Sequence, residues 1–234
     1  MTQTNEDYNL DRADLKLVHA GLPRWYLASL IRLTTIKKHL KITDAVLEIG
    51  CGYSHPLLDI ITKDNYQVVS QYHGVDMCEL PETNSSSYTL QGKFNFVEQW
   101  PELAKSKIRY DKVVHIEVIE HMRPELGVKF LEGCWNLLED DGTMIFSTPV
   151  GAPDRKMSPN HVHEYSYGEM WEFIKKNGFI IKDVTGCYCD VKHLKYDEAY
   201  NKLKNRLSND VLSCVCSASR PAVSRNCLWF CKKG

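Results

Sequence analysis

The feature that most constrains this chain is a two-glycine turn directly after a short apolar run. Val46–Ile49 has the composition of a buried strand, and Gly50 and Gly52 follow it. Glycine allows a sharp turn, and its missing Cβ lets the backbone approach a bound ligand. Ser54 and Pro56 then suit the cap and first position of a helix. The segment predicts a strand, a turn and a helix that together form a ligand-binding element.

Strand and helix patterns alternate through the rest of the chain, which predicts an α/β fold with a mostly parallel sheet covered on both faces. Residues 80–92 are polar and are predicted to form a loop, and residues 140–142 a turn. The expected strands are Val46–Ile49, Val68–Val75, Phe94–Val97, Tyr110–Ile116, Thr143–Ser147, Phe179–Val184 and Asn226–Lys232. The expected helices are Leu10–Ala20, Arg24–Leu40, Pro56–Lys63, Glu117–Met122, one that begins at Pro124, and Tyr167–Asn177.

Length and composition fit one globular domain with an N-terminal extension and one inserted segment. The chain has 234 residues, of which 43% are hydrophobic, enough for an ordinary core. We expect residues 1–41 to form an N-terminal helical cap and residues 42–234 the main domain, with residues 187–224 inserted between the last two strands. The net charge of −1 gives no general attraction to nucleic acid or membranes. The C-terminal segment, residues 190–234, is nevertheless basic.

The cysteines and the first residues indicate a reducing compartment. The nine cysteines are an odd number, and the polar, acidic N-terminus does not resemble a secretory signal. No apolar stretch approaches the roughly 18 residues that span a bilayer. We therefore expect reduced thiols, a cytoplasmic location and no membrane association.

An acid follows the second predicted strand and narrows the choice of ligand. Asp76 lies 24 residues after Gly52, where a carboxylate can accept hydrogen bonds from a ribose diol. Both a nicotinamide dinucleotide and S-adenosylmethionine carry such a ribose. His55 stands where the dinucleotide fingerprint has its third glycine, and Glu48 suits a cationic amino-acid end better than a pyrophosphate. These two residues favour S-adenosylmethionine.

The motifs in this order resemble those of class I S-adenosylmethionine-dependent methyltransferases, including the ubiquinone-type O-methyltransferases. The resemblance covers roughly residues 42–185 and implies a Rossmann-like three-layer αβα sandwich, with a mostly parallel seven-stranded sheet and an antiparallel last strand. The segments that carry it are Val46–Gly52, Gly74–Asp76, Tyr110–Val114, Glu117–His121 and Asp141–Pro149.

The resemblance also implies a set of cofactor-binding residues. The glycine turn would contact the methionine part, Asp76 the ribose, and residues 97–99 the adenine, with Glu98 as the acid near the end of the third strand. The full expected set is Glu48, Gly50, Cys51, Gly52, Asp76, Val97, Glu98, Gln99 and His115.

Carboxylates and histidines cluster after the fourth predicted strand. Glu117, Glu120 and His121 have the spacing of one helix face, and His161 lies in a loop expected to overhang the same edge. Mixed oxygen and nitrogen donors suit a divalent metal such as Mg, Mn or Zn. The pattern resembles the metal motif of small-RNA 3′-terminal 2′-O-methyltransferases. The alternatives are purely structural roles for these side chains, or a metal-free site.

In a metal-free site the candidate general bases are His121, His115 and His163, since imidazole titrates near neutral pH.

The segment after the fourth strand lacks two motifs of other methyltransferases. It has neither the Asn/Asp-Pro-Pro-Tyr tetrapeptide of enzymes that methylate exocyclic amines of DNA nor the Pro-Cys nucleophile of enzymes that methylate cytosine C5. We therefore expect methylation of oxygen.

We expect the acceptor to be a small molecule or a nucleotide-like compound. The first alternative is a metal-dependent RNA ribose 2′-O-methyltransferase, and the second a non-catalytic S-adenosylmethionine-binding scaffold or regulatory protein. An NAD-dependent oxidoreductase is a more distant alternative. The sequence identifies neither the acceptor nor the oligomeric state.

Overall fold

The computed structural model describes residues 24–62, 69–81 and 87–234. The expected helix Leu10–Ala20, and with it most of the N-terminal cap, lies outside the described residues. In the part of the chain that the structure describes, no helix is long and apolar enough to cross a membrane.

A seven-stranded sheet forms the centre of the molecule, in the order β3-β2-β1-β4-β5-β7-β6. β1 to β5 run parallel, and β7 is antiparallel to both of its neighbours, which confirms the expected fold. The strands are β1 Ala45–Ile49, β2 Gln71–Val75, β3 Tyr88–Gln91, β4 Tyr110–Ile116, β5 Leu138–Pro149, β6 Phe179–Cys189 and β7 Ser224–Lys233.

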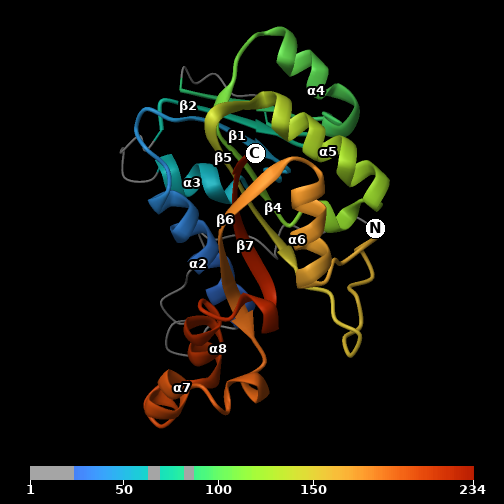
Figure 1. The fold of residues 1–234 in the computed structure, drawn as a ribbon. Coiled ribbons are helices and arrows are strands. Elements are labelled where there is room, and N and C mark those ends of the chain that lie inside the picture. The colour runs from blue at the N-terminus through green and yellow to red at the C-terminus, as the bar shows by residue number, and fades with distance from the viewer. Residues whose placement is uncertain (1–23, 63–68, 82–86) are drawn as a thin grey trace.

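Helices cover both faces of this sheet, so the molecule has three layers (Figure 1). α4, α5 and α6 pack on one face, and α2, α3 and α8 on the other. The helices are α2 Arg24–Lys38, α3 Pro56–Thr62, α4 Phe96–Lys105, α5 Pro124–Leu137, α6 Tyr167–Lys176, α7 Glu198–Leu203 and α8 Asn209–Ser217, with short 3-10 turns η3 Ile119–His121, η4 Val191–Leu194 and η5 Pro221–Val223.

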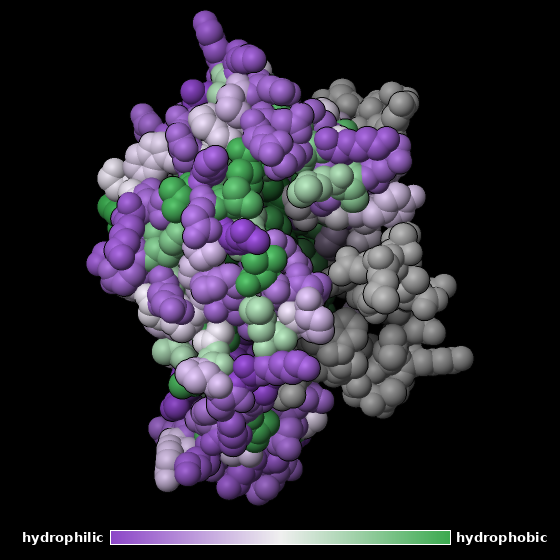
Figure 2. Space-filling model, turned by 90° about the vertical axis from the view of Figure 1, so that its right-hand side faces the viewer, coloured by the Kyte–Doolittle hydropathy of each residue, from purple (hydrophilic) through white to green (hydrophobic). Residues whose placement is uncertain are grey.

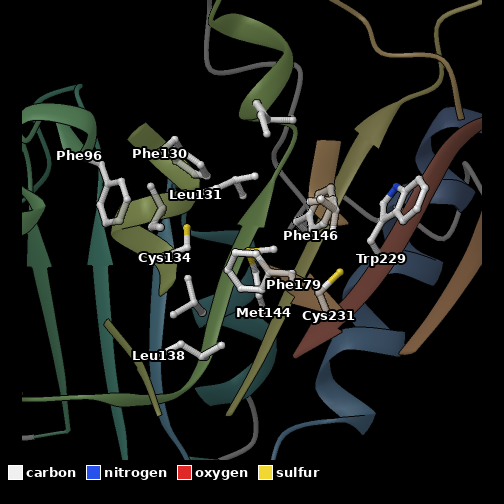
Figure 3. Packing of buried hydrophobic residues seen from close by; sticks show 14 of the residues in the cluster. Phe96, Phe130, Leu131, Cys134, Leu138, Met144, Phe146, Phe179, Trp229 and Cys231 are labelled. Atoms are coloured by element: carbon white, nitrogen blue, oxygen red, sulfur yellow. The ribbon is translucent and has the colours of Figure 1, made fainter. Parts of the chain in front are cut away.

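Aromatic side chains fill the core between the sheet and α4, α5 and α6. Phe146 of β5 stacks on Trp229 of β7 at 5.9 Å between ring centroids, and Phe96 meets Phe130 edge-on at 5.2 Å. Figure 3 shows Phe96 and Phe130 next to each other toward one end of this cluster, and Phe146 beside Trp229 toward the other. The side of the molecule viewed in Figure 2 is mostly hydrophilic and carries only small apolar areas. Packing of this kind fixes the strand ends that carry the site.

The expected third strand is wrong. Phe94 and Phe96 are buried and gave residues 94–97 the alternation of a strand, but α4 begins at Phe96. β3 is instead Tyr88–Gln91, inside the segment predicted to be a loop. β3 is an edge strand whose side chains are at most half-buried, so it lacks the apolar signal of its neighbours.

Two other element boundaries also differ from expectation. Residues 117–122 do not form a helix, because Glu117 has φ +56° and only the short turn Ile119–His121 follows. β5 begins at Leu138, and the predicted turn at residues 140–142 is an irregularity where the register with β4 shifts. By contrast, the expected helix Tyr167–Asn177 is confirmed as α6, which starts at a capping box between Ser166 and Glu169 and is followed by Gly178 at φ +87°.

Replacement of Gly50 by alanine is expected to destabilise the fold by about 2–4 kcal/mol. Gly50 has φ +75°, and a Cβ there would lie 2.5 Å from Cγ2 of Val118. Urea unfolding of Gly50→Ala measures the loss. Gly168→Ala is the matched control, since no described atom outside the local chain lies within 4 Å of a Cβ there. An equal loss in both variants would contradict the steric argument.

Candidate cofactor and acceptor site

The carboxyl ends of the parallel strands bring the chemistry-bearing residues to one edge of the sheet. The glycine turn follows β1, Asp76 follows β2, and Glu117 follows β4. β5 contributes Ser147 and Thr148 beside them, through pairing with β4 and β7. Ligands of open α/β sheets bind at this edge.

The glycine turn and Asp76 form one hydrogen-bonded unit. The N–H of Gly52 donates to Oδ2 of Asp76 at 2.8 Å, and the N–H of Cys78 donates to Oδ1 at 2.8 Å. Gly52 has φ +68°, and a Cβ built on it would meet no described atom beyond its chain neighbours within 4 Å. Open space over a left-handed glycine, next to a fixed carboxylate, fits a nucleoside that lies against the backbone.

Glu48 is buried beneath this turn, with 1% of its surface exposed. The hydroxyl of Tyr72 donates a hydrogen bond to its Oε2. Burial raises the pKa of Glu48 to about 8, the Tyr72 bond lowers it, and Asp76 raises it further. Burial also raises the pKa of the neighbouring Cys51 thiol. Both groups are therefore neutral at pH 7 in this structure.

The residues expected to contact adenine lie on a helix instead of a strand. Val97, Glu98 and Gln99 belong to the first turn of α4, where Oε1 of Gln99 accepts from the N–H of Asn95 at 2.7 Å. Glu98 is exposed and does not follow the third strand, which ends at Gln91. The assignment of Glu98 as the acid at that strand end is therefore wrong.

His115 is enclosed in the core. Its ring stacks on Phe146 at 4.7 Å and meets Phe130 edge-on at 4.8 Å, with none of its surface exposed. Burial lowers its pKa to about 3. An imidazole in this position is neutral and cut off from a solvent-borne acceptor, so the expectation that it serves as a general base does not fit the structure.

Glu117 is held by donors from three elements. Its Oε1 lies 3.0 Å from Nη1 of Arg32 on α2 and accepts from Oγ of Ser147 at 2.7 Å. Nδ2 of Asn226 on β7 donates to both carboxylate oxygens, at 2.9 and 2.8 Å. The left-handed backbone at Glu117 is a strained conformation that these contacts maintain. Sequence reasoning missed Arg32 and Asn226, because neither lies near Glu117 in the chain.

Glu120, His121 and His161 form the one group of three metal-ligating side chains found among residues 24–62, 69–81 and 87–234. Their ligand atoms lie within 4.8 Å of one another. Glu117 is not part of this group, so the expected four-residue set is reduced to three. The two imidazole rings meet edge-on, with centroids 5.0 Å apart.

Each member of this group is oriented by a neighbour. Nδ1 of His121 lies 2.9 Å from the carbonyl oxygen of Asn160, and Nδ1 of His161 lies 2.6 Å from Oε1 of Glu164. These contacts leave Nε2 of each ring for a ligand. Glu120 accepts from Thr148 through Oε2 at 3.2 Å, while its buried Oε1 has no hydrogen-bond partner in the described structure. Burial, and then the charge of Glu117, raise the pKa of Glu120.

His163 lies beside this group without joining it. Its backbone N–H donates to the carbonyl oxygen of Glu120 at 3.1 Å, and its ring meets Tyr165 edge-on at 4.3 Å. The loop thereby fastens to η3, because Val162 also donates to the same carbonyl at 2.8 Å. The expectation that this loop overhangs the strand edge is confirmed. Sequence reasoning assigned no role to Asn160 or Glu164, although Glu164 follows His161 by three residues.

The sheet order, the glycine turn and the Asp76 carboxylate behind it are those of a class I S-adenosylmethionine-dependent methyltransferase. The chain belongs to the mycolic acid cyclopropane synthetase family, whose sequence profile matches residues 28–210. The expected subgroup of ubiquinone-type enzymes is not shown. This membership does not determine the acceptor.

The chain is 26% identical over 155 residues to the S-adenosylmethionine-dependent methyltransferase UmaA of Mycobacterium tuberculosis, a match of 63% of this chain and 49% of that protein. The chain therefore spans about half the length of this relative.

Two solved structures share the fold. A cyclopropane-fatty-acyl-phospholipid synthase-like protein from Lactobacillus casei has a TM-score of 0.54 at 11% identity, and covers 89% of this chain and 91% of its own. The methyltransferase domain of bacterial-CtHen1-CN has a TM-score of 0.56 at 20% identity, and covers 88% and 99%. At these identities the likeness shows the fold alone.

Replacement of Arg32 by methionine is expected to lower the free energy of unfolding by about 3–5 kcal/mol, because it leaves the Glu117 carboxylate without its cation in a largely buried setting. Chemical denaturation measures the change. Lys202→Met is the matched control, since Lys202 pairs with Glu198 on the exposed face of α7 and such pairs contribute little. Equal stability of the Arg32 variant and the parent would contradict the network.

Replacement of Glu48 by glutamine is expected to change the pH dependence of stability. Between the ordinary pKa of a glutamate and about 8, the unfolded chain loses a proton that the native state keeps. Parent stability therefore falls as the pH rises through this window. The neutral variant avoids this loss, so its advantage should grow from about 1 kcal/mol at pH 5 to about 4 kcal/mol at pH 8. Denaturation curves at several pH values test it, and parallel curves would contradict it.

Proposed function

We propose that this methyltransferase methylates an oxygen of a small-molecule or nucleotide-like acceptor, which is held by a divalent cation on Glu120, His121 and His161. The observation that carries the proposal is the convergence of these three side chains within 4.8 Å, at the strand edge that also bears the glycine turn.

The donor set supports a cation of the Mn or Zn type more than Mg. It offers two imidazoles and one carboxylate, and imidazole suits transition metals. Three protein ligands leave coordination positions for an acceptor, as in catalytic metal sites. Carbonyl and carboxylate partners of metal-bound histidines are the usual second layer, and Asn160 and Glu164 occupy these positions here. The unpartnered, buried Oε1 of Glu120 also fits a cation, which would compensate its desolvation.

The residues of the chain mainly position the reactants. S-adenosylmethionine supplies an already activated methyl group, so transfer needs an aligned, deprotonated acceptor oxygen more than further activation. Glu120, His121 and His161 would orient the acceptor, and a cation there would lower the pKa of a coordinated hydroxyl. Asp76 and Gly52 would hold the nucleoside end of the cofactor. His163 is the candidate to take the proton, since its backbone N–H is bound to the carbonyl of Glu120, which keeps this residue beside the group.

A ribose at the 3′ end of RNA is one acceptor that fits this chemistry, since its adjacent hydroxyls can both bind one cation. The fold is shared with a small RNA methyltransferase, HEN1, at a TM-score of 0.57 and 16% identity. The basic segment that follows β6 offers Lys192, Lys195, Lys202, Lys204 and Arg206.

A lipid acyl chain is the second candidate acceptor, and family membership is the observation that favours it. The family takes its name from mycolic acid cyclopropane synthetase. In this case the carbon of a double bond, and no hydroxyl, receives the methyl group, so the acceptor has no oxygen for a cation to hold.

A methyl-transfer assay with labelled S-adenosylmethionine separates these acceptors. The substrates are RNA with an intact 3′ diol, the same RNA after periodate oxidation, free nucleosides, catechols, and vesicles of unsaturated phospholipid, each with and without excess chelator. The proposal expects chelator-sensitive transfer to a diol. Transfer to phospholipid in chelator, or full activity on hydroxyls in chelator, would overturn it.

Metal binding itself is expected to depend on the ligands and on their second layer. Titration calorimetry with Mn²⁺ on the purified protein should show one site. Glu120→Gln is expected to weaken binding about 100-fold, and Glu164→Gln about 10-fold through the loss of His161 orientation. His193→Gln, on an exposed turn outside the site, is the matched control. Unchanged affinity in Glu120→Gln would exclude this site.

A further inference from the structure

His55 closes the glycine turn in a conformation that costs the chain stability. It has φ +44°, so it shares the left-handed region with Gly50 and Gly52. A side chain with a Cβ is disfavoured there, although histidine is found there more often than most residues. Glycine would fit this position without strain, and the presence of histidine therefore calls for a reason in its side chain.

The ring of His55 is buried without satisfying its polar atoms. The residue is 8% exposed, and neither Nδ1 nor Nε2 has a hydrogen-bond partner within the described structure. Burial lowers its pKa, and the charge of Asp76 and the nearby backbone of Gly52, which lies outside hydrogen-bond geometry in the described structure, raise it again. A neutral imidazole has one N–H donor and one acceptor. Buried polar groups of this kind normally have a hydrogen-bond partner.

The surroundings of the ring point to a bound nucleoside as that partner. The two groups that raise the pKa of His55, Asp76 and Gly52, are hydrogen-bonded to each other at 2.8 Å. The position of a Cβ on Gly52 opens into space that no described atom outside the local chain occupies within 4 Å. Because the charge of Asp76 acts on the ring of His55, a polar ligand group bound to this carboxylate would lie close to the imidazole.

We propose that His55 is a cofactor-binding residue, whose ring hydrogen-bonds the ribose of S-adenosylmethionine together with Asp76. A ribose hydroxyl both donates and accepts hydrogen bonds, so it matches the carboxylate and the neutral imidazole at once. The inference depends on the shared methyl donor and not on the proposed cation or acceptor.

Calorimetric titration with S-adenosylhomocysteine tests this role without the need for an acceptor. His55→Gly removes the ring and relieves the backbone, so it is expected to fold at least as stably as the parent and to bind about 10-fold more weakly. Lys107→Gly is the matched control, because Lys107 has φ +59° in the turn before β4. It should gain stability without any change in affinity.

Two further measurements separate the possible contacts. 5′-Methylthioadenosine retains the ribose but lacks the amino-acid end, so its affinity should fall by the same factor in His55→Gly. A loss confined to S-adenosylhomocysteine would assign the ring to the methionine part and overturn the ribose contact. Unchanged affinity for both compounds would exclude His55 from the site.

The parent protein provides a readout that does not depend on the variant's folding. The ring signals of His55 in NMR spectra, assigned by comparison with His55→Asn, are expected to shift on addition of 5′-methylthioadenosine. The ring signals of His193, on its exposed turn, should not move. Saturating ligand without any shift of the His55 signals would reject the proposal.

Discussion

The ion pair between Arg32 and Glu117 is the interaction on which the acceptor side of this molecule depends. Glu117 stands where the chain leaves β4 in a left-handed conformation, and a glutamate keeps that conformation only when its surroundings hold it. Arg32 comes from α2, Ser147 from β5 and Asn226 from β7. One carboxylate thus joins one helix to two strands, and the direction in which η3 presents Glu120 and His121 follows from it.

The same arrangement explains why two nearby glutamates behave differently. Glu117 has a guanidinium and an amide against its oxygens. Glu120 is fully buried, accepts from one hydroxyl and faces the charge of Glu117, so its pKa is raised. Sequence spacing alone treats the two as equivalent ligands on one helix face. Their separation arises from the backbone at Glu117, which no spacing rule includes.

The sequence predicted the sheet except for β3, and it predicted that the glycine turn and Asp76 meet at one edge, because both depend on local signals. The apolar run before Gly50, the turn itself and Asp76 are read directly from neighbouring residues, and α6 is framed by Ser166 and Gly178. The predictions failed where contacts between distant parts of the chain determine the secondary structure or the burial of a residue. β3 is a half-exposed edge strand without an apolar pattern, and His115 was counted as a site residue although its strand buries it against Phe130 and Phe146. Arg32 and Asn226 meet Glu117 only after the sheet has formed.

The antiparallel pairing of β6 and β7 has a consequence for how such a protein changes its specificity. Cys189 is opposite Ser224 at the end of this pair, so the two ends of the intervening segment are held side by side. α7 and α8 belong to this segment: α8 packs against β6 and α2, whereas α7 lies farther from the sheet (Figure 1). Because β6 and β7 hold both ends of the segment, the part that contains α7 can change in length without a change of register in the sheet, whereas α8 is held by its packing against β6. The segment rejoins the sheet at Ser224, two residues before the Asn226 that contacts Glu117, so a change in the segment can occur close to the site without altering the strands.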